Sequence, residues 1–228
     1  MQNHFRAISL SYKKASLAIR EQISLDEQES AQLLTQLRDI LGIQEALVLS
    51  TCNWTEIYYT AEQSFSFELI KLLAIRKKVP SPLDLTSHFQ IFDESAEACE
   101  HLFRVSIGLE SQVVGDLQII NQAKRAYQLS ADLGLAGPYL HRLMHTIFFT
   151  NKRVVQETFF RDGAASVSYV TVEMLEEVCR DFIDPSILVV GLGEIGADVV
   201  RNLQSAGIPN IKITNRTEQK AIDLAQEC

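Results

Sequence analysis

The chain has few cysteines, and none of them is spaced as a metal or redox motif. The four lie at positions 52, 99, 179 and 228, without a Cys-x-x-Cys pair and too sparse for a disulfide framework, which favours a reducing cytoplasm. Long apolar runs are also lacking: none approaches the roughly 18 residues of a membrane span, and the N-terminus does not have the layout of a signal peptide. We therefore expect a cytoplasmic protein that makes no use of a membrane.

The chain also lacks an excess of positive charge. The net charge is −8, with 16 Lys and Arg against 18 Asp and Glu in residues 1–161, and 5 against 11 in residues 162–228. A protein that binds nucleic acid nonspecifically would have the opposite sign. Any contact with RNA must therefore be local and confined to the first part of the chain.

The first 93 residues alternate between strand and helix patterns. Strands are expected at residues 5–10, 47–50, 54–59 and 88–92, and helices from a cap at Asp26 to Gly42 and over residues 67–78. This β-α-β-β-α-β order predicts a ferredoxin-like α+β sandwich. The apolar residues expected on the inner helix faces are Leu33, Leu34, Leu37, Ile40 and Leu41, then Leu69, Ile70, Leu72, Leu73 and Ile75.

Residues 94–161 have helical patterns throughout, with helices starting near Ser95, Asp116 and Pro138. We assign residues 1–161 to one domain, with the sandwich at 1–93 and a helical part at 94–161. Asp162-Gly163 is the expected hinge, and Ser166 is expected to cap the next helix. Residues 162–228 form the second predicted domain.

A tight polar corner separates the two middle strands of the predicted sandwich. It reads Ser50-Thr51-Cys52-Asn53, and it would leave Cys52 partly exposed among hydroxyl and amide groups. A thiol in such a place ionises and attacks a carbonyl more readily than one in a core. The alternative is a small buried hydrophobe, which is how most free cysteines behave.

A dinucleotide fingerprint lies in the second predicted domain. The run Gly191-Leu192-Gly193-Glu194-Ile195-Gly196 follows a β-branched strand, expected to be buried, at residues 187–190 and precedes a helix and a second strand at 211–213. The amides at the start of that helix would hold a pyrophosphate. The sequence therefore predicts the start of a Rossmann-type domain, of which two strands are only a part.

The residues after the second of these strands favour NADP over NAD. An NAD site usually places Asp or Glu there, whereas this chain has Asn215-Arg216-Thr217. Arg216 is suited to pair with a 2′-phosphate. The alternative is that Asn215 and Thr217 cap the following helix.

Five segments in order resemble the glutamyl-tRNA reductase family. Residues 49–60 resemble its LSTCNRTE segment, residues 101–111 its HLFRVASGLDS segment, residues 115–122 its GEPQI..Q segment, and residues 151–158 its AKRVRTET segment. The glycine turn through Thr217 resembles its nucleotide segment. The similarity extends from about Phe5 to Glu227.

The resemblance implies an NADPH-dependent reduction of glutamyl-tRNA to glutamate-1-semialdehyde, the first step of five-carbon tetrapyrrole synthesis. Cys52 would be the nucleophile that carries a thioester, and His101 matches the family's essential histidine, although a histidine on an apolar helix is more often a core residue. The positions that match the family's substrate-binding residues are Thr51, Asn53, Trp54, Ser111, Asp116, Leu117, Gln118 and Gln122. The resemblance also implies glutamyl-tRNA as substrate, an aminomutase that receives the aldehyde, and a homodimer formed through a region absent from this sequence.

The chain departs from the family pattern at three places. Trp54 replaces an arginine, Asp116-Leu117 replaces Glu-Pro, and Tyr12 falls near the family's N-terminal histidine. A second hypothesis is therefore a catalytically weakened relative that only binds charged tRNA or a partner protein. Cys52, His101 and the glycine turn favour the working enzyme.

Two further patterns bear on ligand binding. His141 and His145 have the spacing of a metal pair, but no third ligand is evident, and we expect no metal. Pairs of basic residues are usually solvated but are suited to the tRNA backbone. They are Lys13, Lys14, Lys124, Arg125, Lys152 and Arg153.

Overall fold

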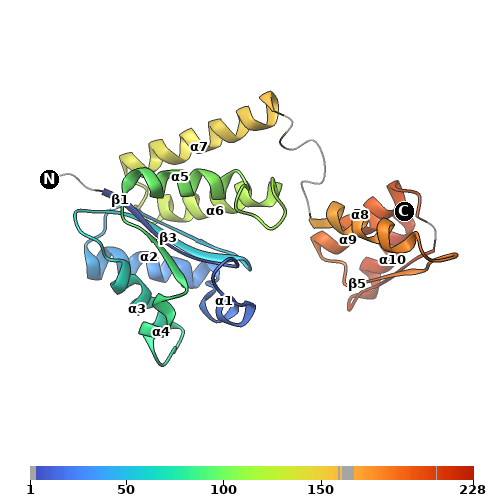
Figure 1. Cartoon of the computed structure of the whole chain (residues 1–228), viewed down its shortest axis with the longest axis horizontal. Helices are drawn as coiled ribbons and strands as arrows, with labels where there is room; N and C mark the ends of the chain where they lie inside the picture. Colours follow the sequence, from blue (N-terminus) through green and yellow to red (C-terminus); the bar gives the residue numbers. More distant parts are fainter. Residues whose placement is uncertain (1–3, 159, 161–166, 209) are drawn as a thin grey trace. The chain divides into compact units, whose positions relative to one another are not determined.

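The computed structural model describes residues 4–158, 160, 167–208 and 210–228. The chain divides into two compact units, which are described separately (Figure 1). Unit 1 comprises residues 1–111 and 118–158, and unit 2 comprises residues 112–117 and 159–228. The expected hinge at Asp162-Gly163 and the expected cap at Ser166 lie outside the described residues.

Unit 1 is built on a four-stranded antiparallel sheet. Its strands are β1 (His4–Ser11), β2 (Ala46–Ser50), β3 (Trp54–Ala61) and β4 (Phe89–Phe92), in the order β2-β3-β1-β4. In the register of β1 with β3, Ser9 lies opposite Glu56 and Ser11 opposite Trp54. This is the strand order of the ferredoxin-like fold, so the expected sandwich is confirmed.

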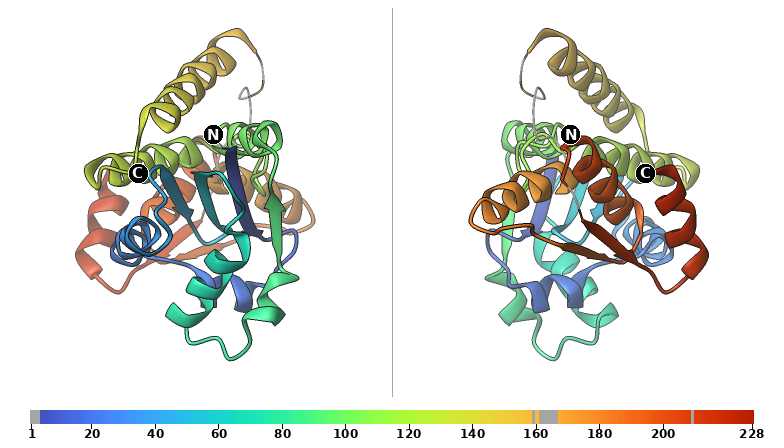
Figure 2. Two further views of the ribbon diagram at one scale, coloured as in Figure 1. Left: turned by 90° about the vertical axis from the view of Figure 1, so that its left-hand side faces the viewer. Right: turned by 90° about the vertical axis from the view of Figure 1, so that its right-hand side faces the viewer.

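Helices cover both faces of this sheet, as Figures 1 and 2 show. On one face lie α1 (Leu17–Ile23), α2 (Glu27–Leu41), α3 (Ser66–Arg76) and the short α4 (Pro82–Thr86); on the other lie α5 (Ser95–Ser106), α6 (Leu117–Asp132) and α7 (Pro138–Glu157). Alternate residues of β3 serve the two cores: Ile57 and Tyr59 pack with the first layer and Tyr58 with the second. All eight residues of β3 are buried for this reason.

Local signals explain where the helices of unit 1 begin and end. Asp26 Oδ1 accepts from Glu29 N at 2.7 Å while Glu29 Oε2 accepts from Asp26 N at 3.0 Å, a capping box at the start of α2. Gly42 ends this helix with a φ of +69°, a conformation that favours glycine. Pro138 stands in the first turn of α7, where a missing N–H costs nothing.

The prediction of an inward-facing side chain is wrong at two positions, Ile40 and Ile75. Ile40 is 63% exposed because it lies at the edge of the buried stripe of α2, in its last turn. Ile75 is 64% exposed because it follows the buried Leu73 by two positions, and two residues of an α-helix point in nearly opposite directions at that spacing. The core side of α3 is formed instead by Ser66, Leu69, Ile70, Leu73 and Ala74.

Unit 2 contains a two-stranded parallel sheet and three helices. The elements are α8 (Val167–Cys179), β5 (Ile187–Val190), α9 (Glu194–Ser205), β6 (Ile211–Thr214) and α10 (Glu218–Glu227). The strand–glycine turn–helix–strand order expected for the start of a Rossmann-type domain is confirmed. Val172, Ile187, Val199 and Leu203 form its main core cluster.

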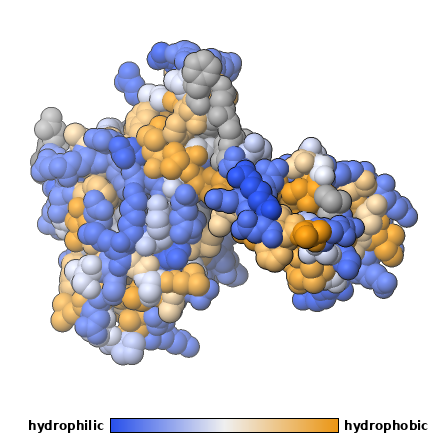
Figure 3. Space-filling model, turned by 45° about the vertical axis from the view of Figure 1, so that its right-hand side comes forward, coloured by the Kyte–Doolittle hydropathy of each residue, from blue (hydrophilic) through white to orange (hydrophobic). Residues whose placement is uncertain are grey.

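The expectation that β5 is buried is wrong for half of its residues. Ile187 and Val189 face the helices, whereas Leu188 is 61% exposed and Val190 is 74% exposed. The helices of unit 2 pack against one face of the sheet, and side chains alternate between faces along a strand. Figure 3 shows hydrophobic residues in patches among hydrophilic ones on the face of the molecule that it presents. Within the described residues, no helix is both long and apolar enough to cross a membrane.

Candidate active site

Cys52 is exposed at the tip of the hairpin between β2 and β3, and the backbone around it is held by hydrogen bonds. Thr51 Oγ1 accepts from the backbone N–H of Asn53 at 3.1 Å and of Trp54 at 3.3 Å, a local turn that a threonine hydroxyl commonly makes. From α1, Arg20 Nη1 donates to Cys52 O at 2.8 Å and to Asn53 Oδ1 at 3.1 Å. The tip therefore has a fixed backbone and an accessible thiol.

His101 is held by a buried carboxylate, Glu56, which the sequence analysis missed. His101 Nε2 lies 2.9 Å from Glu56 Oε1, and Glu56 also accepts from Ser9 Oγ at 2.6 Å and from Tyr58 Oη at 2.7 Å. Its side chain is only 1% exposed. The available signal was a charged residue inside the otherwise apolar and aromatic strand at residues 54–61.

This network fixes the orientation of its members. Nε2 of His101 faces the Glu56 carboxylate, an acceptor of hydrogen bonds, and Nδ1 is the ring nitrogen that this contact leaves available. The imidazole also stacks on Phe92, with ring centroids 4.3 Å apart. Burial and then the Glu56 carboxylate raise the pKa of the Tyr58 phenol well above its usual range, so Tyr58 remains a donor.

His101 and Glu56 line an open cavity of about 510 Å³. Its rim carries Lys13, Arg104 and Glu110, which form ion pairs. Partial burial acts to raise the pKa of Glu110, but the hydrogen bonds from Lys13 and Arg104 outweigh it and lower that pKa. Cys52 is not one of the residues that line this cavity.

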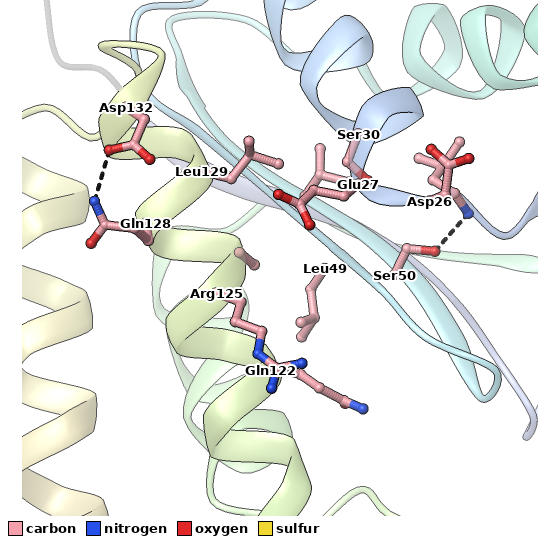
Figure 4. A pocket seen from close by; sticks show the side chains of 13 residues that line it. Asp26, Glu27, Ser30, Leu49, Ser50, Gln122, Arg125, Gln128, Leu129 and Asp132 are labelled. Atoms are coloured by element: carbon pink, nitrogen blue, oxygen red, sulfur yellow. Dashed lines mark hydrogen bonds between the residues drawn. The ribbon is translucent and has the colours of Figure 1, made fainter. Parts of the chain in front are cut away.

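A second cavity of about 450 Å³ lies between α2, β2 and α6 (Figure 4). Gln122, Arg125 and Glu27 line it together with Leu49 and Ser50. The structure therefore places Gln122 beside a different cavity from that of His101.

Trp54 lies between these two cavities in a small apolar cluster. The indole is 2% exposed and packs with Leu49, Val105 and Ile119. Leu49 lines the cavity of Gln122, while Trp54 and Val105 line that of His101. At the position where the family motif has an arginine, this chain therefore has a buried tryptophan that is part of the core.

Several polar atoms at the sequence-predicted substrate positions are buried and have no hydrogen-bond partner among the residues that the structure describes. They are Trp54 Nε1, Ser111 Oγ and Gln122 Oε1. Buried polar groups in native proteins are nearly always paired, so such atoms are candidates for contacts with a ligand. Asp116 is mostly buried and Leu117 begins α6; both belong to unit 2, whereas Gln118 belongs to unit 1.

The glycine turn of unit 2 has the geometry that a dinucleotide requires. Gly191 has a φ of +93°, and Gly193 stands at the start of α9. A Cβ added to Gly196 would lie 2.0 Å from the carbonyl oxygen of Gly191, so only glycine fits there. Glu194 and Ile195 form the first turn of α9, whose free amides attract an anion.

Asn215 links the glycine turn to the end of β6. Its Oδ1 accepts from Leu192 N at 3.1 Å, and its Nδ2 donates to Thr217 O at 3.0 Å. Thr217 is the N-cap residue of α10, but its side chain makes no capping hydrogen bond. Arg216 is exposed, and within the described part of unit 2 no hydrogen bond or ion pair holds its guanidinium.

His141 and His145 lie on α7 with ring centroids 4.3 Å apart, and Tyr127 Oη is hydrogen-bonded to His141 Nδ1. Within the described ranges, no three His, Cys, Asp or Glu side chains gather as metal ligands do.

Comparison with known proteins places this arrangement in a family. Residues 8–158 match the family model described as glutamyl-tRNAGlu reductase, N-terminal domain, and residues 173–228 match that of shikimate / quinate 5-dehydrogenase. The glutamyl-tRNA reductase of Cytophaga hutchinsonii is 56% identical over 100% of this chain and 54% of its own length. That of Chromohalobacter salexigens is 36% identical over 97% of this chain and 52% of its own length.

A solved structure gives the same result. Glutamyl-tRNA reductase from Methanopyrus kandleri matches with a TM-score of 0.67 and 28% identity, over 99% of this chain and 53% of that one. The chain thus spans about half the length of the relatives that it matches. The resemblance found in the sequence is confirmed, and the chain belongs to the glutamyl-tRNA reductase family.

Proposed function

We propose that the protein reduces glutamyl-tRNA to glutamate-1-semialdehyde with NADPH, through a thioester on Cys52, as the first step of five-carbon tetrapyrrole synthesis. The observation that carries this proposal is the exposed Cys52 thiol on a hairpin tip whose backbone is hydrogen-bonded on both sides. A nucleophile held in this way loses little freedom when it meets an ester carbonyl.

The chemistry requires two bonds to be exchanged in the first step. The Cys52 thiolate attacks the carbonyl carbon of the glutamyl ester, the bond from that carbon to the ribose oxygen breaks, and the ribose oxygen takes a proton as tRNA leaves. His101 is proposed to move that proton at Nδ1, with Glu56 holding its other nitrogen. Glu56 then acts as a positioning residue.

The glutamyl group is proposed to be bound by the residues at the family's substrate positions. The buried atoms of Trp54, Ser111 and Gln122 that lack a partner among the described residues support this role, because each could meet a polar group of the substrate. Trp54 lines the cavity of His101 and Gln122 lines the second one. Thr51 and Asn53 hold the tip through one oxygen each and retain further hydrogen-bonding capacity. The same role is proposed for Asp116, Leu117 and Gln118.

The cofactor proposed for unit 2 is NADPH. The turn supports a pyrophosphate: Gly191 has a left-handed conformation, and Gly196 leaves no room for a side chain. Arg216 would pair with the 2′-phosphate, and Asn215 would hold the turn in place. When bound, NADPH supplies the hydride that reduces the acyl group.

Three further features are proposed for the whole protein. The product is an amino aldehyde, which is reactive, so direct transfer to an aminomutase would protect it. The relatives are about twice as long as this chain, and the additional length is proposed to support a homodimer. We also propose a cytoplasmic location.

Substitution of Cys52 in the complete protein tests this function. Cys52→Ser should abolish reduction and leave tRNA binding nearly unchanged. Cys99→Ala is the matched control, because Cys99 is a half-buried residue of α5 and its loss should cost only about 1 kcal/mol of stability. Retention of most turnover by the serine variant would exclude Cys52 as the nucleophile.

A further inference from the structure

The segment that contains α6 and α7 has a net positive charge, unlike the rest of unit 1. Residues 117–158 contain five Lys and Arg against two Asp and Glu, a net charge of +3. Residues 1–116 contain 10 against 16, a net charge of −6. Of the two acids in this segment, Glu157 forms an ion pair with Arg153, and Asp132 accepts from the neutral Gln128. With both acids counted, the basic segment still has a net positive charge on an acidic protein.

Aromatic side chains lie among these charges and contact one another, with Tyr127 and Phe148 half-buried. Lys124 Nζ on α6 lies 5.9 Å from the ring centroid of Phe148 on α7, so the two helices are in contact here. Tyr127 contacts the rings of His141, His145 and Phe148 with centroids about 6 Å apart. We call this surface the α6–α7 ridge, and its members are Lys124, Tyr127, His141, His145, Phe148, Phe149 and Lys152.

The ridge has the length and exposure of a docking surface. His141, His145, Phe148 and Lys152 follow the i, i+4, i+7, i+11 spacing of one helix face, which at 1.5 Å per residue extends for about 16 Å. Lys124, His141, His145 and Lys152 are exposed. Phe149 follows His145 by one helical turn and is 62% exposed.

We infer that the α6–α7 ridge is the surface on which the RNA part of the substrate docks. Positive side chains neutralise phosphates and release their counterions, while exposed aromatic rings stack on unpaired bases. The net charge of +3 over residues 117–158, together with the exposed ring of Phe149, favours RNA over a protein partner, because RNA offers both phosphates and bases. This inference rests on the proposed function, because it takes glutamyl-tRNA as the substrate.

Paired lysine substitutions test the ridge by tRNA binding. The probe is an uncharged tRNA transcript specific for glutamate, titrated with the 228-residue chain at several salt concentrations and followed by fluorescence anisotropy. Lys124→Gln with Lys152→Gln should weaken binding about tenfold or more at low salt and reduce the slope of log K against log salt by about two. Lys71→Gln with Lys78→Gln is the matched control; both lysines are exposed elsewhere on unit 1, and binding should change less than about twofold.

A second variant separates stacking from charge. Phe149→Ala should weaken binding by about fivefold or more while leaving the salt slope unchanged, because a stacked base releases no counterion. Equal losses in the ridge and control pairs would overturn the inference. So would unchanged tRNA binding accompanied by a shift in the sedimentation of the chain alone, which would identify the ridge as an interface between copies.

A small substrate distinguishes failure of the ridge from failure of the proposed function. A glutamate α-thioester of a small thiol should acylate Cys52 equally in the unmutated chain and in the ridge variant, since it carries no RNA. If the unmutated chain binds tRNA through the ridge but is not acylated, the proposed function is wrong and the docking surface stands. If it is acylated and the ridge variant binds tRNA normally, the ridge inference is wrong.

Discussion

Replacement of Glu56 by glutamine tests whether a buried carboxylate positions His101. The carboxylate accepts from Ser9, Tyr58 and His101. Hydrogen bonds to a charged group are worth about 1.5–3 kcal/mol each and neutral ones about 0.5–1.5 kcal/mol. Glutamine keeps the shape of the side chain but loses the charge and turns one acceptor into a donor. We expect Glu56→Gln to lower the free energy of unfolding by about 1–3 kcal/mol.

Urea unfolding measures the loss of stability, and nitrogen NMR of the imidazole measures the change in the state of His101. His101 should lose its fixed Nε2–H form, and kcat of the complete protein should fall on the order of tenfold or more, with little change in KM. Glu97→Gln is the control, because Glu97 lines the same cavity but is exposed, and it should change stability by less than about 0.5 kcal/mol. Unchanged stability and an unchanged imidazole signal in Glu56→Gln would refute the positioning role.

Four other predictions concern separate parts of the molecule. Gly196→Ala should disrupt the glycine turn and abolish NADPH binding measured by calorimetry, whereas Gly193→Ala, whose added Cβ meets nothing within 4 Å, should retain the fold of unit 2 by circular dichroism. Trp54→Arg should raise kcat/KM for glutamyl-tRNA at least several-fold in the complete protein while lowering Tm, because the indole is buried; a lower kcat/KM would reopen the substrate assignment. Asp26→Ala should cost about 1–2 kcal/mol in urea unfolding through loss of the capping box. The lowered pKa of Glu110 stabilises the fold above about pH 4.5, and this contribution is lost as the pH falls through that pKa, so Glu110→Gln should flatten the acid limb of stability against pH.

The ends of α2, the Cys52 corner and the glycine turn could be predicted from the sequence, because each depends on residues within one turn of the chain. Asp26 and Gly42 mark the ends of α2 because a cap and a left-handed residue act within one helical turn. The Cys52 corner was predictable because a polar turn separates two strands. The glycine turn was predictable because Gly191 takes a left-handed φ and Gly196 leaves no room for a side chain, and both requirements are local.

The parts that were not predicted depend on contacts between distant residues. Glu56 meets His101 across 45 positions because β3 pairs with β1 and α5 packs on that face, which no local pattern encodes. The burial of Trp54 likewise depends on the packing of α5 and α6.

The central claim is that Cys52 accepts the glutamyl group from tRNA, and intact-protein mass spectrometry tests it most directly. Glutamyl-tRNA mixed with the protein in the absence of NADPH should add the mass of one glutamyl group, and peptide mapping should locate it on Cys52. Cys52→Ser should show no thioester, and hydroxylamine should remove the adduct from the unmutated protein. An adduct on Cys99 or Cys179, or no adduct from a preparation that reduces glutamyl-tRNA at its normal rate once NADPH is added, would contradict the account.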